Sequence, residues 1–137
     1  MKVFIDATVL IYLNVGISGR IGDLKQFWKS LVENHKLYTN LIVLDEVIYV
    51  LKRKYAVEPS STLKFIDKMV LPQVIDVGLR EYLEARKYIL EYGMKPSDAI
   101  HLATIESNRI DAIATEDKDF DVVGIESCGS DSWSVSQ

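Results

Sequence analysis

Hydrophobic positions along the chain follow two spacings, one typical of buried strands and the other of amphipathic helices. Residues 2–5 carry the continuous apolar run Val3, Phe4 and Ile5, which indicates a strand covered on both faces. Residues 23–34 instead repeat apolar side chains every three or four positions, as the buried face of a helix does. The apolar side chains of that segment are Leu24, Phe27, Trp28, Leu31 and Val32.

The two spacings alternate through the rest of the chain. They predict strands at residues 2–5, 37–39, 74–77, 112–114 and 122–125. They predict helices at residues 23–34, 42–55, 59–70 and 79–91, and from 97 to about 108. Pro59 in a first turn, Gly93 after a last turn and Ser97 as an N-cap are the expected boundary residues. Strands that alternate with helices predict the α/β class, here a three-layer α/β/α sandwich with a mainly parallel central sheet.

Length and composition fit one globular domain. The 137 residues predict a domain at 1–128 followed by a polar tail at 129–137, and a hydrophobic fraction of 48% is enough for an ordinary core. Asp6 interrupts the apolar start, so we interpret that start as a strand and not as a signal peptide. No apolar stretch approaches the roughly 20 residues that span a bilayer. The single cysteine, Cys128, fits a reducing compartment, and we expect a cytoplasmic protein with no membrane partner.

Three aspartates lie where a parallel sheet places its functional sites. Asp6 directly follows the first predicted strand, and Asp117 lies just beyond the strand at 112–114. Asp98 falls in the first turn of a predicted helix, where the helix dipole stabilises a negative charge by roughly 0.5 kcal/mol. Ligand sites in such folds form outside the carboxyl ends of the strands, so we expect the three carboxylates at one edge of the sheet. Aspartate is also common after strands and at helix starts, so none of the three alone identifies a site.

Glu46 is the more informative acid. It lies inside the helix predicted at 42–55, in the stretch 42–51 that is apolar nearly all round, so we expect this part of the helix to be largely buried. A buried carboxylate without a partner is costly and needs a cation or a site. No basic residue stands one helical turn further on. The alternatives are an exposed acidic notch formed with Asp45, or a pair with Arg53 two turns on.

The four carboxylates together predict a metal centre. Carboxylates in close pairs repel each other by up to about 4 kcal/mol at an effective dielectric constant of about 20, and a divalent cation relieves that repulsion. An all-oxygen ligand set favours Mg²⁺ or Mn²⁺. The predicted metal ligands are Asp6, Asp98 and Asp117, and Glu46 is the predicted proton acceptor. Such a site suits phosphodiester hydrolysis, and the formal net charge of −4 does not exclude a nucleic-acid partner because the metal neutralises the site locally.

Four segments resemble, in order, the motifs of PIN domains. The opening residues 1–11 are similar to the family's first strand, which ends in an aspartate followed by a small or hydroxyl residue. Residues 44–47 resemble the second acidic motif, although the residues after Glu46 are more apolar than the family pattern. Residues 96–104 resemble the third motif, which is the most specific, and residues 114–121 resemble the fourth. The resemblance covers residues 1 to about 125.

The resemblance implies a metal-dependent endoribonuclease that cuts RNA, and the size of the chain is similar to VapC-type toxins of type II toxin–antitoxin pairs. It also implies a cognate antitoxin as partner. A homodimer is expected because such toxins pair through helical faces and the helices at 23–34 and 59–70 carry surplus apolar side chains. The residues it assigns are Asp6, Glu46, Asp98 and Asp117 as the acidic quartet, Thr115 as an orienting hydroxyl, and Asp119 as an accessory acid or a capping residue.

Other functions remain open at this point. A PIN nuclease that processes RNA outside a toxin system fits the same motifs. A phosphatase of the haloacid-dehalogenase type would use Asp6 as nucleophile, but such an enzyme requires a second aspartate at the position of Thr8. A receiver-type phosphoacceptor requires a lysine on a late loop, and Lys118 is a poor match for it. A non-catalytic binding module is the last alternative. His101, one turn beyond Asp98, is a candidate base, but it is more readily expected to pack or to cap its neighbours. The basic residues 52–54 either follow the helix dipole or touch an RNA backbone.

Overall fold

The computed structural model describes residues 1–16, 21–115 and 126–128, and these residues form a parallel sheet of five strands. β1 (Lys2–Ile5) lies at the centre, between β2 (Lys36–Asn40) and β4 (Ala112–Ala114). β3 (Val74–Ile75) borders β2, and β5 (Glu126–Cys128) borders β4. Each of these strand pairs is parallel, as the alternation of strands and helices predicts.

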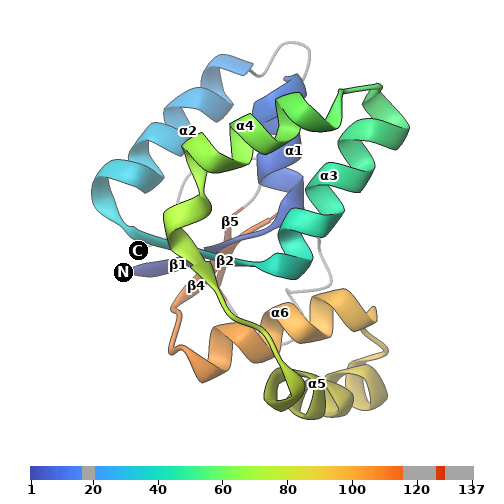
Figure 1. The fold of residues 1–137 in the computed structure, drawn as a ribbon. Helices are drawn as coiled ribbons and strands as arrows, with labels where there is room; N and C mark the ends of the chain where they lie inside the picture. The colour runs from blue at the N-terminus through green and yellow to red at the C-terminus, as the bar shows by residue number, and fades with distance from the viewer. Residues whose placement is uncertain (17–20, 116–125, 129–137) are drawn as a thin grey trace.

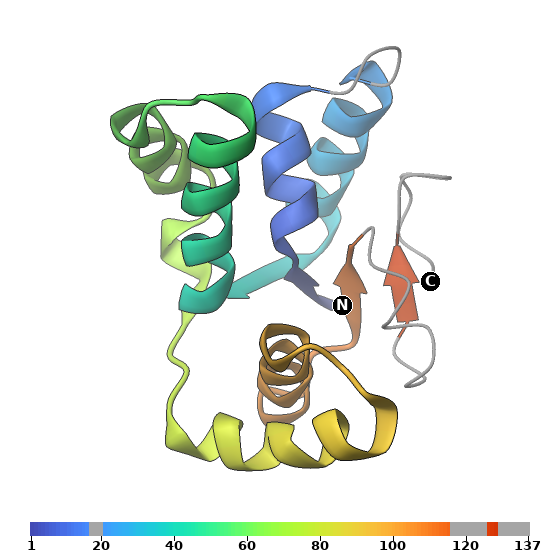
Figure 2. The same ribbon diagram turned by 90° about the vertical axis from the view of Figure 1, so that its right-hand side faces the viewer.

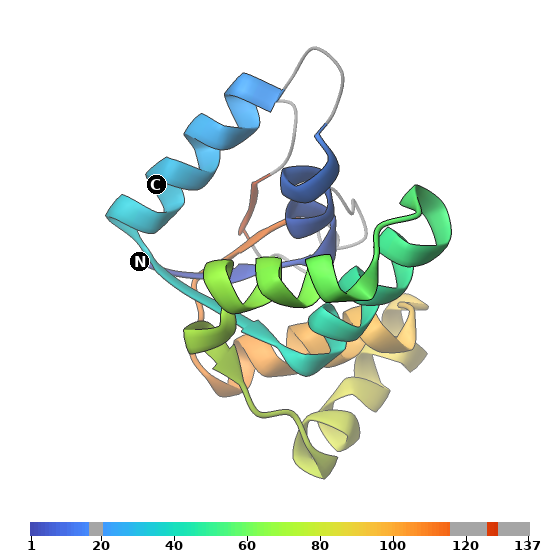
Figure 3. The same cartoon turned by 45° about the horizontal axis from the view of Figure 1, so that its top comes forward.

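Helices cover both faces of the sheet, so the molecule has the three predicted layers (Figures 1 and 2). One face is covered by α1 (Ala7–Val15), α2 (Ile21–Asn34), α3 (Leu41–Tyr55) and α4 (Pro59–Met69). The other face is covered by α6 (Pro96–Ser107), and α5 (Leu79–Tyr92) packs against the outer side of α6. Figure 3 brings the first layer forward and shows α4 leading through the short 3-10 turn η1 (Leu71–Gln73) into β3. None of the helices described is both long enough and apolar enough to cross a bilayer.

The centre of the sheet is fully enclosed. Val3 and Phe4 of β1 have no exposed surface and Ile5 has 1%, which confirms a strand covered on both faces. The three residues of β4 are equally buried. The burial of both central strands agrees with the apolar runs that predict them.

α1 is the element that the hydrophobic spacing does not predict. Its residues are apolar with no helical repeat, because the helix packs between α2 and α3 and buries Val9, Leu10 and Ile11. Asp6 is its N-cap residue, and the chain leaves the helix at Gly16, whose φ of 77° is readily adopted only by glycine. The chain therefore turns from β1 into a helix immediately after the first acidic residue.

Several predicted boundaries differ from those observed. The expected N-cap at Ser97 is wrong: α6 begins at Pro96 with Lys95 as the N-cap residue, because proline suits the first helical position. The strand expected at 74–77 is only Val74–Ile75. The strand expected at 122–125 and the tail at 129–137 lie outside the described residues, and the observed last strand is β5. Gly93 ends α5 in the left-handed conformation, as expected.

Candidate metal centre

The register of β1 against β4 brings Asp6 beside Thr115. Ile5 is paired with Ala114, and the Asp6 amide donates to the Ala114 carbonyl oxygen at 3.0 Å. One residue further along, the Thr115 hydroxyl donates to Oδ2 of Asp6 at 2.5 Å. The other carboxylate oxygen, Oδ1, accepts from the Ala7 amide at 2.8 Å. The Asp6 side chain is thus held from two elements at the carboxyl edge of the sheet, where the sequence predicts a site.

Asp6 is buried but compensated. Its exposed fraction is 3%, and that of Thr115 is also 3%. The two hydrogen bonds replace part of the water that a buried carboxylate loses, and the N-terminus of α1 adds a favourable dipole. The hydroxyl that the PIN resemblance assigns to orientation therefore contacts the first acid directly.

Glu46 lies close to Asp6, in surroundings that differ from the expected ones. The helix that carries it is not apolar all round in its packing: its buried face consists of Val43, Leu44, Val47 and Leu51, and Glu46 is on the exposed side. The expectation of a buried Glu46 is therefore wrong, because hydrophobicity alone does not tell which apolar side chains of α3 face solvent. One oxygen of Glu46 nevertheless lies within 4.8 Å of the carboxylate of Asp6 and of an imidazole nitrogen of His101. The three groups form a cluster that is open to solvent on the Glu46 side.

His101 completes this cluster, which goes beyond the packing role expected for it. The ring has no exposed surface, lies 5.3 Å from the Phe4 ring between centroids, and places Nε2 3.9 Å from Oδ1 of Asp6. Burial lowers the pKa of His101 from 6.5 to about 4, so the imidazole is neutral at pH 7. The sequence does indicate that His101 lies near the site, because it follows Asp98 by one turn on the same face of the helix.

The remaining predicted acids divide into two groups. Asp98 lies in the first turn of α6, as predicted, and is 6% exposed. Within the part of the chain that the structure describes, its carboxylate is not among the groups within 4.8 Å of one another at the cluster. Asp117 and Asp119 lie outside the described residues, so their places in the quartet and beside it stay predictions.

Asn40 is a polar residue at the site that the sequence analysis misses. It ends β2, has no exposed surface, and contacts His101 through its side-chain amide at 3.2 Å. The available signal is an asparagine between a predicted strand and a predicted helix, which is the composition of an N-cap. Its amide oxygen does cap α3, by accepting from the Val43 amide at 3.0 Å.

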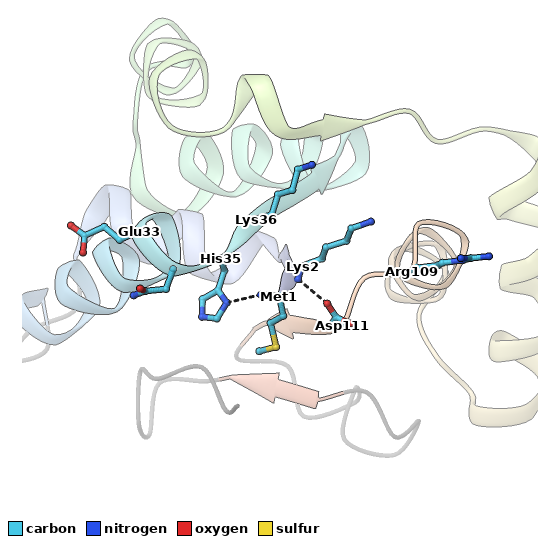
Figure 4. Close-up of a pocket in the computed structure, with 8 residues that line it drawn as sticks. Met1, Lys2, Glu33, His35, Lys36, Arg109 and Asp111 are labelled. Carbon is cyan, nitrogen blue, oxygen red and sulfur yellow. Dashed lines mark hydrogen bonds between the residues drawn. The ribbon is translucent and has the colours of Figure 1, made fainter.

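The opposite edge of the sheet is chemically different. Charged side chains surround an open hollow at the amino ends of β1 and β2 (Figure 4). Asp111 accepts there from the Lys2 backbone amide at 2.8 Å, and the Met1 amine lies 3.4 Å from Nδ1 of His35. Basic residues, among them Lys36, line the same hollow. In the described residues, this edge gathers charges of both signs, whereas the carboxyl edge concentrates acids around a buried imidazole.

The fold and the cluster together define a class of protein: a small parallel α/β/α domain with a carboxylate-rich site at the carboxyl edge of its central strands. The sequence model of the PIN domain family matches residues 3–126. The chain therefore belongs to the PIN domain family.

Solved structures with the same fold include several toxins. VapC20 of Mycobacterium tuberculosis, described as a toxin that cleaves the sarcin–ricin loop, is 20% identical, with a TM-score of 0.72 over 90% of this chain and 95% of that one. A toxin–antitoxin complex from Klebsiella pneumoniae is 24% identical, with a TM-score of 0.67 over 89% and 92%. VapBC2 of Rickettsia felis, bound to a fragment of its promoter DNA, is 18% identical, with a TM-score of 0.70 over 94% and 98%. At these identities the likeness concerns the fold, and no curated protein matches the sequence.

Proposed function

We propose that this chain is a metal-dependent endoribonuclease that hydrolyses RNA and acts as the toxin of a toxin–antitoxin pair. The observation that carries the proposal is the cluster of Asp6, Glu46 and His101, whose ligand atoms lie within 4.8 Å of one another at the carboxyl edge of the sheet. Membership of the PIN family and the fold shared with VapC20 support the same activity.

The residues present fit a hard divalent ion. Two carboxylates within 4.8 Å repel each other, and a cation between them removes that repulsion. Asp6 is already oriented by Thr115 and Ala7, so its carboxylate is held in place at the edge of the sheet where an ion would bind. We propose that Asp6, Asp98 and Asp117 would hold Mg²⁺ or Mn²⁺, with Glu46 beside the ion as the proton acceptor.

The chemistry divides between the ion and the side chains. When bound, a divalent ion polarises a phosphodiester and makes water a stronger acid. Asp6 keeps its carboxylate fixed, because both oxygens accept hydrogen bonds from ordered backbone or side-chain groups. We propose that Glu46, which lies on the exposed side of α3, takes a proton and passes it to solvent. Hydrolysis by water should leave a 5′-phosphate and a 3′-hydroxyl.

The direct test is cleavage of labelled single-stranded RNA with and without Mn²⁺, with analysis of the product ends. Asp6→Asn and Glu46→Gln should lose cleavage, whereas Asp45→Asn, a neighbouring exposed acid outside the cluster, should keep it. A 2′,3′-cyclic phosphate, or full activity of Asp6→Asn, would overturn the mechanism. Hydrolysis of a phosphomonoester without cleavage of RNA would favour the phosphatase alternative.

Metal binding by the quartet has a separate readout. Mn²⁺ should raise the melting temperature of the wild type, because the ion binds only the folded arrangement of carboxylates. Asp98→Asn should lose most of that rise. An unchanged response to Mn²⁺ in Asp98→Asn would remove this residue from the proposed ligand set.

The proposed toxin role brings a partner and an oligomeric state. Induced expression of the wild type in a bacterial host should arrest growth, and Asp6→Asn should not. We propose an antitoxin as the cognate partner and a homodimer that pairs through helical faces; Val32 on α2 and Leu63 on α4 are 54% and 50% exposed. Light scattering that shows a monomer at micromolar concentration would contradict the dimer. The cytoplasmic location stays a prediction.

A further inference from the structure

A buried polar network lies directly beneath the acidic cluster. Asn40, His101 and Thr104 come from β2 and α6, and none of the three has any exposed surface. The Asn40 amide nitrogen donates to the Thr104 hydroxyl at 3.1 Å and lies 3.2 Å from Nδ1 of His101. The Thr104 hydroxyl in turn donates to the Ile100 carbonyl at 2.9 Å, so its oxygen is free to accept from Asn40.

The orientation of the Asn40 amide is fixed by the cap of α3. Its oxygen accepts from the Val43 amide, a donor that cannot be reversed. Turning the amide around would place two donors against each other at Val43 and leave that buried amide unsatisfied. The nitrogen of Asn40 therefore faces the imidazole, and Nδ1 of His101 has to act as an acceptor.

This contact decides which ring nitrogen of His101 carries the proton. A neutral imidazole has one N–H group, and with Nδ1 accepting, that group is on Nε2. Nε2 is buried, makes no hydrogen bond with the described residues, and lies 3.9 Å from Oδ1 of Asp6. A nitrogen that carries a proton has no lone pair to offer to a cation. Nε2 of His101 is therefore close enough to the two carboxylates to act as a metal ligand, but the proton that it carries prevents coordination.

We propose that Asn40 holds His101 in its Nε2–H form, so that the imidazole presents an N–H group toward Asp6 and is withheld from the metal. The inference rests on the proposed metal-dependent function. It makes Asn40 and His101 positioning residues that determine metal specificity, because carboxylate oxygens favour Mg²⁺ and Mn²⁺ whereas imidazole favours Zn²⁺, Co²⁺ and Ni²⁺.

The first experiment observes the tautomer in the wild type. Long-range ¹H–¹⁵N correlation spectra of the metal-free protein distinguish Nε2–H from Nδ1–H in each ring. The chain has two histidines, so His35 serves as an internal reference. We expect Nε2–H for His101. An Nδ1–H form overturns the inference without the need for any variant.

The second experiment reverses the contact with Asn40→Asp. One aspartate oxygen continues to cap α3, and the other presents an acceptor to Nδ1, so the proton should move to Nδ1 and leave Nε2 with a lone pair facing Asp6. Titration calorimetry should then show a Zn²⁺-to-Mn²⁺ affinity ratio at least tenfold higher than in the wild type. The double variant Asn40→Asp/His101→Gln has the same added charge without the imidazole, and there the gain should vanish.

The outcomes separate this inference from the proposed function. An unchanged affinity ratio in a folded Asn40→Asp, or a gain that persists in the double variant, refutes the role of His101 in metal selection. Nε2–H in a wild type that binds no Mn²⁺ refutes the metal-dependent function, while the tautomer assignment stands. Mn²⁺ binding by a wild type whose His101 is in the Nδ1–H form refutes the tautomer assignment, while the metal-dependent function stands.

Discussion

Replacing Thr115 with valine keeps the shape of the side chain and removes the hydroxyl that donates to Asp6. The donor and the acceptor are both 3% exposed, so water does not readily replace the lost bond. Hydrogen bonds to charged groups contribute about 1.5–3 kcal/mol, and we expect Thr115→Val to lose about that much free energy of unfolding. For a domain of this size the melting temperature should fall by roughly 5–10 °C.

The same variant should bind metal more weakly. Groups that hydrogen-bond to a metal ligand typically account for about 10- to 100-fold in affinity, so Thr115→Val should lose about that much affinity for Mn²⁺. The assay is urea denaturation followed by circular dichroism, combined with titration calorimetry. Thr115→Ser keeps the hydroxyl and should recover most of both losses.

Thr39 offers a matched control. It is a buried threonine at the end of β2, and its hydroxyl donates to the Ile5 carbonyl at 2.9 Å. Thr39→Val therefore loses a bond to a neutral acceptor, worth about 0.5–1.5 kcal/mol, and should leave Mn²⁺ affinity unchanged. Equal effects of Thr39→Val and Thr115→Val on metal affinity would refute a specific role of Thr115 at Asp6.

Three further predictions concern other parts of the chain. Ala56 ends α3 with a φ of 55°, so Ala56→Gly should raise the free energy of unfolding by about 0.5–1 kcal/mol in urea titrations. His101 has a pKa of about 4 in the fold against 6.5 unfolded, so the unfolded chain binds more protons between these values. The free energy of unfolding of the metal-free protein should therefore fall by up to about 3 kcal/mol as the pH is lowered from 6.5 to 4. Tyr49 is 61% exposed one turn beyond the cluster, with the Arg53 guanidinium 5.9 Å from its ring centroid. Tyr49→Ala should raise KM for single-stranded RNA at least about fivefold at constant kcat, whereas Tyr82→Ala, at a position 50% exposed on α5, should change neither.

The sheet could be predicted from the sequence because its central strand is unambiguous. Val3, Phe4 and Ile5 form a short apolar run of the kind found in strands covered on both faces, and the alternation of strands with helices favours parallel pairing. The order of the strands is not contained in that pattern. Only the pairing of Ile5 with Ala114 places Thr115 against Asp6, and a different neighbour for β1 would have separated them.

The surroundings of the site were harder to predict than its position. α1 has no amphipathic repeat because it is covered on several sides, so the spacing of its hydrophobic residues does not predict a helix. For α3, the sequence predicted too much burial. The helix contains more apolar residues than its buried face requires, and Tyr49 is exposed to solvent. Asn40 shows a third limit of prediction from sequence. Its side chain caps α3 and also contacts the His101 ring on α6, and the sequence pattern indicates only the cap.

The two acids of the cluster differ in how firmly each side chain is held before a metal ion or a substrate binds. Asp6 is short, buried and held by two hydrogen bonds, so it loses little conformational freedom when an ion binds. Glu46 is longer and exposed, and fixing a side chain of that kind costs up to about 2 kcal/mol. A fixed acid and an adjustable one suit a site that must hold an ion at one place and also accommodate a substrate that arrives and leaves. The rigid half of the site is built on the strand ends and the adjustable half on the solvent side of a helix, which is why the strand pattern predicts the first so much better than the second.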